Sequence, residues 1–326
     1  MQVVTLFAPE LFHRVETMVY FLAIGEVCRV RVATRFDGNE TTEHPWALRR
    51  MREFGGVEIT HCDEPTESDV LVFQLVRHGR IPNELDPWRA RAQSAAYLRP
   101  SEGPSSWGDW WRETIRSFPH YLRARKITLR PYIHPGLFAN PKWRQSSFEP
   151  IDVDAPRRWR IGFLGNRQPP ERTARLVECR KALVGVDRVQ WHEYGDGASN
   201  GRRGIAPMEY ITALSEMDFC ISPPGWSWYT HRTIEALVRG SIPIIEDPEV
   251  YGLALRDNET CIIARSDNWG ATVQRALKMS EADIRRMRRS VIALRERQLL
   301  PQRAIEHFRS QLFPGRNCLV CEAETR

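Results

Sequence analysis

The chain has 326 residues, more than one hydrophobic core usually serves, so two domains of ordinary size are expected. Hydrophobic residues make up 42% and charged residues 27% of the chain, a balance typical of soluble globular proteins that excludes a disordered chain. The net charge of +6 comes mainly from arginine, whose planar guanidinium matches the oxygens of phosphates and carboxylates, which favours an anionic ligand. Charge alone decides nothing, because a basic composition also arises without a ligand.

Short apolar runs alternate with segments of helical period through the first half of the chain. The runs at 3–8, 27–33, 57–62 and 69–76 predict strands, and the segments at 9–25 and 44–56 predict helices. Such alternation indicates βαβ units with a mostly parallel sheet covered on both faces. We therefore expect a Rossmann-like domain over residues 1–150.

The pattern weakens between about residues 80 and 150, where Pro, Trp and Arg are frequent. The last part has the composition of a linker, so we place the domain boundary near residues 151–158. Trp107, Trp110 and Trp111 have two interpretations, a platform on which a sugar stacks or the anchors of a core helix.

The alternation starts again in the second half. Strands are expected at 159–166, 189–195, 218–221 and 241–247, and helices at 169–185, 206–217 and 230–240. This pattern predicts a second Rossmann-like domain over residues 151–300. The expected fold class is thus α/β, with two doubly wound domains facing across a cleft and a ligand at the carboxyl ends of the strands.

The last part of the chain, residues 280–313, is predicted to be helical and interrupted at Pro301. We expect the helix and tail of residues 301–326 to return to the N-terminal domain. Arg285, Arg286, Arg288 and Arg289 form a predicted basic face, which is either a contact for an anionic membrane surface or an ordinary solvated face.

No segment approaches the roughly 20 apolar residues of a membrane span, and no secretory leader is evident, so a cytoplasmic or peripheral location is expected. A metal site is not expected. Cys318 and Cys321 have the spacing of a metal-binding pair, but no second pair accompanies them, and a frayed tail is the favoured interpretation.

The turn between the strand at 218–221 and the helix at 230–240 is the most informative stretch. It reads SPPGWSWYTHR and delivers backbone N–H groups, the hydroxyls of Ser227 and Thr230 and the Arg232 guanidinium to the start of a helix, where an anion is favoured. Gly225 permits close approach of the backbone, and Trp226, Trp228 or Tyr229 can stack on a base or sugar. The alternative is structural: Arg232 and Glu235 form a surface pair and the aromatic residues are core.

Residues 208–247 resemble the C-terminal part of exostosin-like glycosyltransferases. The match lies on a helix, a strand of the type S-x-F-C-L-x-P-x-G and a following S-x-R-x-x-E-A helix that ends in glycine before I-P-I-I, and it extends to the upstream segment RIGFLGNRQPPERTARLVE. Matching positions are Ser215, Phe219, Cys220, Pro223, Gly225, Arg232, Glu235, Ala236, Gly240, Ser241, Pro243 and Ile244. The resemblance covers about residues 160–269 and implies a GT-B fold.

The resemblance also implies roles for individual residues. Glu235 would hold the ribose of a nucleotide-sugar donor, Arg232 would stabilise the departing diphosphate, and the loop after the first strand of the second domain would close the phosphate site. The expected donor-binding residues are Gly165, Asn166, Arg167, Pro224, Gly225, Trp226, Ser227, Tyr229, Thr230, Arg232 and Glu235. Ser227 stands where retaining relatives carry a second glutamate, which favours an inverting enzyme.

Sugar transfer also needs a group that takes the proton from the acceptor hydroxyl. We expect it in the first domain, residues 1–150, which would be the acceptor side of the molecule. The candidates left open, at the ends of its strands, are Glu10, His13, His78 and His134. No DxD run is placed as a metal site, so metal-independent transfer without a cofactor is expected.

The leading hypothesis is a glycosyltransferase that moves a sugar from a nucleotide-diphosphate sugar to a glycan, a lipid-linked precursor or another hydroxyl acceptor. An epimerase of nucleotide sugars would share the donor site but would need no acceptor. A basic nucleic-acid-binding or nucleic-acid-glycosylating protein is the third hypothesis, although the arginines are scattered among acidic residues and form no recognised nucleic-acid motif.

Overall fold

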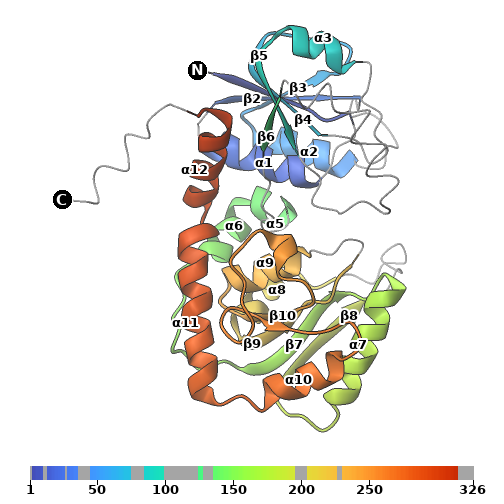
Figure 1. Cartoon of the computed structure of the whole chain (residues 1–326), viewed down its shortest axis with the longest axis vertical. Coiled ribbons are helices and arrows are strands. Elements are labelled where there is room, and N and C mark those ends of the chain that lie inside the picture. The colour runs from blue at the N-terminus through green and yellow to red at the C-terminus, as the bar shows by residue number, and fades with distance from the viewer. Residues whose placement is uncertain are drawn as a thin grey trace, which may run out of the picture. The chain divides into compact units, whose positions relative to one another are not determined.

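A computed structural model of the protein describes residues 2–9, 13–25, 28–35, 45–74, 84–98, 124–127, 135–194, 204–225 and 230–314. The chain divides into two compact units (Figure 1). The N-terminal unit comprises Met1–Leu129 with Pro301–Arg326, and the C-terminal unit comprises Arg130–Leu300. Sequence composition predicted the domain boundary near residues 151–158. The contacts instead group helices α5 (Pro135–Ala139) and α6 (Pro141–Phe148) with the C-terminal unit.

The N-terminal unit contains a parallel sheet. Its described strands are β1 (Val3–Phe7), β2 (Arg29–Thr34), β3 (Val57–His61), β4 (Ser68–Gln74), β5 (Ala92–Leu98) and β6 (Arg125–Ile127), in the order β3-β2-β1-β4-β5-β6. This is the doubly wound order of a dinucleotide-binding domain. The change of direction falls between β1 and β4, whose carboxyl ends therefore lie side by side.

Helices cover both faces of this sheet (Figure 1), and alternate side chains of each strand point to opposite faces. On one face Phe7, Leu71 and Phe73 pack with Trp88 of α3 (Leu85–Ala90). Figure 1 shows α3 on one side of the sheet, and α1 (His13–Ile24) and α2 (Pro45–Phe54) on the other.

Helix α12 (Pro301–Leu312) completes the N-terminal unit. Its Phe308 ring packs against Phe21 of α1, with 6.1 Å between the ring centroids. The Arg125 guanidinium donates to the carbonyl oxygens of Gln311 and Leu312 at 3.0 and 2.8 Å, so a strand residue caps the last turn of the helix. The interruption predicted at Pro301 is confirmed, since the preceding helix α11 (Glu281–Gln298) ends three residues earlier.

The C-terminal unit contains a second parallel sheet. Its described strands are β7 (Trp159–Asn166), β8 (Val189–Tyr194), β9 (Met217–Ile221), β10 (Ile242–Ile245) and β11 (Ile262–Ile263), in the order β11-β10-β9-β7-β8. The chain leaves β7 toward β8 on one side and later returns to the other side through β9 and β10. The two sheets confirm the predicted α/β class with two doubly wound Rossmann-like units.

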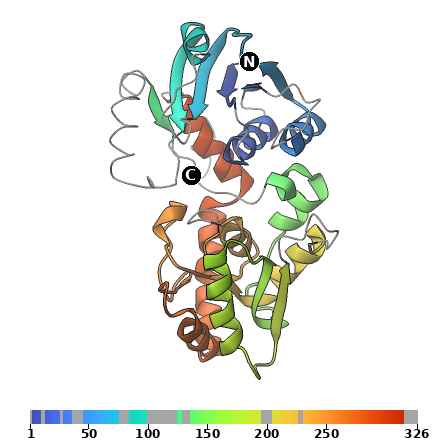
Figure 2. The ribbon, with the colours of Figure 1, turned by 90° about the vertical axis from the view of Figure 1, so that its right-hand side faces the viewer.

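The opposite winding directions place helices on both faces of the second sheet, because parallel crossovers are right-handed. Helices α8 (Pro207–Ser215) and α9 (His231–Val238) share one face, where Leu214 and Ala236 pack with Leu164 and Cys220 of the strands. Helix α7 (Pro170–Ala182) follows the other winding direction and packs along α10 (Trp269–Leu277) (Figures 1 and 2).

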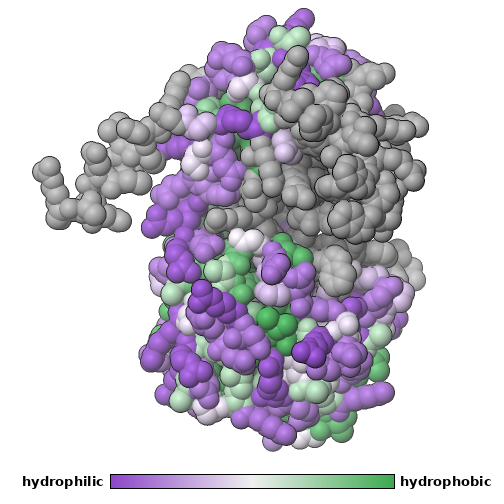
Figure 3. Space-filling model, in the orientation of Figure 1, coloured by the Kyte–Doolittle hydropathy of each residue, from purple (hydrophilic) through white to green (hydrophobic). Residues whose placement is uncertain are grey.

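Helix α11 joins this unit through a buried ion pair. Arg288 is 3% exposed and donates to the carboxylate of Asp218, which is 1% exposed at the start of β9 and is also 3.3 Å from Arg160. The predicted basic face is therefore wrong for Arg288. Arg286 and Arg289 are exposed and pair with Asp283 and Asp154, and Figure 3 shows the outer side of α11 as mainly hydrophilic.

Three buried arginines also fix the segment that precedes β7. Arg239 donates to the carbonyls of Ser146 and Ser147, Arg295 to those of Phe148 and Glu149, and Arg288 to those of Val153 and Ala155. Every contact of this carbonyl clamp is made to the backbone. Residues 146–155 are thus held along α9 and α11 without regular structure after α6.

In the part of the chain that the structure describes, no helix combines the length and the apolarity that a membrane crossing requires.

Removal of the Asp218 carboxylate tests how far the C-terminal unit depends on this ion pair. Asp218→Ala leaves the Arg288 charge buried without its partner, and we expect a loss of about 3–5 kcal/mol in the free energy of unfolding, measured by urea denaturation. Glu281→Ala is the control, because that carboxylate also pairs with Arg160 but is 57% exposed, and it should cost at most about 1 kcal/mol. Equal losses of unfolding free energy in the two variants would show that the C-terminal unit does not depend on the ion pair between Asp218 and Arg288.

Candidate functional site

The carboxyl ends of β7 and β9 form the topological switch point of the C-terminal unit. The two strands are neighbours, yet the chain leaves β7 toward α7 and β9 toward α9, so the connections diverge to opposite faces. Open parallel sheets bind ligands in the crevice outside such a point. The predicted loops lie here: Gly165 and Asn166 end β7, and Pro224 and Gly225 follow β9.

Arg232 is the second residue of α9 and reaches back to the end of β7. Its Nε donates to the carbonyl of Leu164 at 2.8 Å, and its guanidinium carbon lies 4.4 Å from the centroid of the Phe163 ring. Gly165 adopts φ +149°, and a Cβ at this position would lie 2.0 Å from Arg232 Nη2. Glycine is required here because the guanidinium occupies the space of a side chain. Arg232 Nη1 is buried and has no hydrogen-bond partner among the described residues.

Arg172, in the first turn of α7, occupies a similar position at the loop after β9. Its Nε donates to the carbonyl of Pro224 at 3.0 Å, and its Nη1 donates to that of Asn166 at 3.1 Å. A Cβ on Gly225 would lie 1.9 Å from Arg172 Nη2. This one side chain therefore ties together the two loops that the sequence placed at the site.

The two guanidiniums form an electrostatically unbalanced pair. Arg172 and Arg232 are each 9% exposed, and no carboxylate among the described residues pairs with either of them. Burial, and next the charge of Arg232, lower the pKa of Arg172 to about 9. Both guanidiniums remain charged near neutral pH, and the positive charge of each disfavours that of the other. An anion beside the pair would offset this repulsion, so the arrangement is suited to bind one.

Helix α9 supplies the remaining described residues of the site. Thr230 precedes its first turn, and the backbone N–H of Thr230 donates to the hydroxyl of Tyr251 at 3.1 Å. Glu235 is 6% exposed, and one of its carboxylate oxygens accepts from the hydroxyl of Tyr210 at 2.5 Å. The interpretation of Arg232 and Glu235 as a surface pair is wrong, because both side chains are buried.

Other predicted residues are placed differently or not described. Arg167 has an exposed side chain, and its backbone holds the turn through Tyr194 and Thr173. Trp226, Ser227 and Tyr229 lie outside the described residues, as do Glu10, His78 and His134. His13 begins α1, but its side chain is outside the description. Glu10 and His78 belong to segments that directly follow β1 and β4, the two strands at the first sheet's own switch point.

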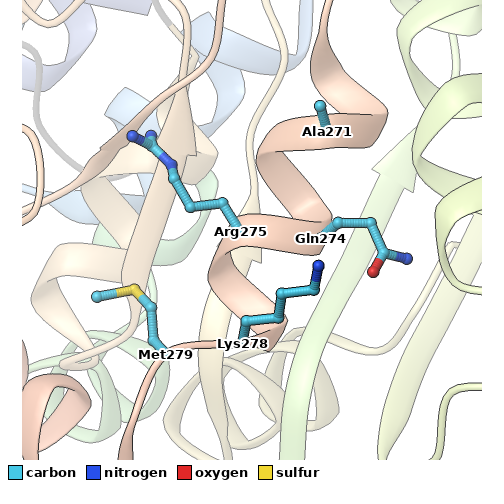
Figure 4. Close-up of a pocket in the computed structure, with 5 residues that line it drawn as sticks. All are labelled: Ala271, Gln274, Arg275, Lys278 and Met279. Carbon is cyan, nitrogen blue, oxygen red and sulfur yellow. The ribbon is translucent and has the colours of Figure 1, made fainter.

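A surface pocket of about 590 Å³ lies elsewhere on the C-terminal unit. It is lined by one face of α10 and the residues after it: Ala271, Gln274, Arg275, Lys278 and Met279 (Figure 4). The Met279 carbonyl accepts from Arg160, the second residue of β7, which places the pocket near the amino ends of the strands. The pocket is therefore distinct from the switch point.

Comparison with known proteins gives a likeness in fold. No protein-family model and no curated protein matches the sequence. A sucrose-phosphate synthase from Thermosynechococcus elongatus has a TM-score of 0.54 at 14% identity, over 94% of this chain and 97% of that chain. The N-terminal domain of a trehalose-6-phosphate phosphatase from Candida albicans has a TM-score of 0.58 at 8% identity, over 94% and 95%.

The fold is of the GT-B type. Both likenesses extend over nearly the whole chain, so they include both sheets. At such low identity they show the arrangement of the backbone alone, and the different names of the two proteins illustrate that the GT-B fold does not set the reaction.

Two residues of this GT-B chain were missed at the sequence level. Arg172 lies in the first turn of a helix, where the helix dipole disfavours a positive charge. An arginine in that position can therefore indicate that an anion binds near the start of the helix. Tyr210 gave no such signal, since an aromatic residue in an amphipathic helix is normally core.

Gly165→Ala tests the contact between the loop after β7 and Arg232. The new Cβ displaces the guanidinium, so we expect a lower midpoint of thermal unfolding. We also expect inorganic diphosphate to stabilise the wild type and not this variant. Gly185→Ala is the matched control, because Gly185 also has a positive φ, +74°, but nothing lies within 4 Å of its Cβ position. That control should lose about 1 kcal/mol from backbone strain and keep the response to diphosphate.

Proposed function

We propose that the protein is a glycosyltransferase that moves a sugar from a nucleotide-diphosphate sugar to a hydroxyl group of a glycan or lipid-linked acceptor. The observation that carries the proposal is the pair of buried guanidiniums, Arg172 and Arg232, at the switch point of a GT-B fold. Their shared requirement for an anion is met by the diphosphate of such a donor. The name of one structural neighbour, the sucrose-phosphate synthase, also supports a reaction on sugars.

Departure of the nucleoside diphosphate concentrates negative charge on the β-phosphate. Preorganised donors stabilise such charge at no reorganisation cost when the bond breaks. Arg232 is held on the Leu164 carbonyl and Arg172 on those of Pro224 and Asn166, so both guanidiniums are fixed before the donor arrives. The first turn of α9 adds backbone N–H groups beside Thr230.

The finer features of the proposal rest on the resemblance to exostosin-like transferases. Glu235 accepts hydrogen bonds from the ribose, and the arginines replace a metal ion in charge stabilisation. Ser227 stands in place of the second glutamate of retaining relatives, which supports inversion at the anomeric carbon. The base that takes the acceptor proton comes from Glu10, His13, His78 or His134, among which the proposal makes no choice.

Nucleotide binding is the first test. The wild type is melted with UDP, GDP, dTDP, CMP and ADP, and one diphosphate is expected to raise the unfolding midpoint by the equivalent of about 2.7 kcal/mol at a hundred times its dissociation constant. Arg232→Ala and Arg172→Ala should each abolish most of this shift, because each leaves the diphosphate with one charged partner.

Arg180→Ala is the matched control for these two variants. It removes the same charge from α7, but the Arg180 side chain is 58% exposed and lies against Trp191 and Glu193. It should keep the full shift. A wild type that responds to none of the nucleotides, or an Arg180→Ala variant that loses as much as Arg172→Ala, would refute the donor site.

The reaction itself is tested by product analysis. With the matching nucleotide sugar and a panel of glycan and lipid-linked acceptors, we expect transfer in the presence of EDTA and inverted configuration in the anomeric proton coupling of the product. An epimerised nucleotide sugar formed without acceptor would identify an epimerase instead. Loss of transfer in EDTA, with recovery on addition of Mg²⁺ or Mn²⁺, would overturn metal independence alone.

A further inference from the structure

The hydroxyl of Tyr210 holds the Glu235 carboxylate of the candidate site. It donates to Glu235 Oε2 at 2.5 Å, and the two residues come from different helices, α8 and α9. The Tyr210 ring packs on the cluster that includes Leu164, Cys220 and Ala236, so the position of its hydroxyl is set by the core of the sheet. A rigid donor thus meets a buried carboxylate.

The carboxylate of Glu235 is buried and needs hydrogen-bond donors in place of water. A short bond to a charged acceptor is among the stronger hydrogen bonds in proteins. Burial, and next the Glu235 charge, raise the pKa of Tyr210 well above its ordinary value, so the hydroxyl stays protonated and keeps donating. The contact holds one oxygen of Glu235 in place and so restricts the orientation of the carboxylate.

The contact lies at the ligand edge of the sheet. A helix between parallel strands runs against them, so α8 and α9 both begin at the carboxyl edge, where Tyr210 is the fourth residue of α8. Glu235 is one helical turn beyond Arg232, and its side chain leans toward the start of α9. The tyrosine therefore approaches Glu235 from the α8 side, while Arg232 reaches toward β7.

We propose that Tyr210 is a positioning residue that orients the Glu235 carboxylate to accept the ribose hydroxyls of the donor nucleotide. This inference rests on the proposed function. Tyr210 touches no reacting atom and acts through Glu235 alone. Its loss should consequently weaken recognition of the ribose while leaving recognition of the diphosphate by Arg172 and Arg232 intact.

The test compares Tyr210→Phe with the wild type by calorimetric titration of UDP, GDP and ADP, of their 2′,3′-dideoxy counterparts, and of inorganic diphosphate. We expect the wild type to bind one ribonucleotide more tightly than its dideoxy form. In Tyr210→Phe the ratio of these two affinities should fall about tenfold, the loss typical of one hydrogen bond to a charged group. Affinity for inorganic diphosphate should be unchanged.

Two further variants separate positioning from general damage. Tyr251→Phe removes another buried hydroxyl that contacts the start of α9, so it should affect ribose and dideoxy forms alike and keep the preference. The double variant Tyr210→Phe with Glu235→Gln should bind ribonucleotide no more weakly than Glu235→Gln alone, since Tyr210 acts only through that carboxylate.

An unchanged preference in Tyr210→Phe, or equal weakening of both nucleotide forms, overturns the role of Tyr210 while the donor site stands. A wild type that binds diphosphate and nucleotides without regard to the ribose hydroxyls overturns the role of Glu235 as well. A wild type that binds no nucleotide overturns the proposed function and this inference together.

Discussion

Two guanidiniums buried beside one another, with carbonyl oxygens as their described partners, are the constraint on which the candidate site depends. Carbonyl groups orient Arg172 and Arg232 but carry no net charge to balance them. The glycines at 165 and 225 exist in these positions because each guanidinium fills the space where a side chain would begin. Charge, backbone conformation and loop sequence are therefore parts of one arrangement, and the proposed diphosphate would balance its charge.

Among the strands that the sequence identified, β1, β2, β4 and β10 are rich in β-branched residues. Such residues fit the strands of a parallel sheet whose two faces are covered by helices. Strand β5 was missed within the region from residue 80 to 150. Its sequence AQSAAYL has little strand preference, and its conformation is imposed by pairing with β4 at six positions. Strand β6 is three residues long, too short for any period to appear.

The parts of the site that lie close together in the sequence could be predicted from it. The turn after β9, the glycine loop after β7 and Arg232 follow from a motif whose members are close together. Arg172 and Tyr210 meet their partners across 52 and 25 residues, so only the folded sheet brings them to the switch point. The alternative that Arg232 and Glu235 form a surface pair came from their spacing of three residues, whereas the structure buries both side chains and gives them separate partners.

The carbonyl clamp on residues 146–155 has a consequence for how the sequence can change over time. The hydrogen bonds that Arg239, Arg288 and Arg295 donate to this segment go to six backbone oxygens and to none of its side chains. Substitutions within the segment leave those oxygens in place, while a change at any of the three arginines removes two contacts at once. The path of the segment therefore depends on arginines that lie 92 to 147 residues further along the chain.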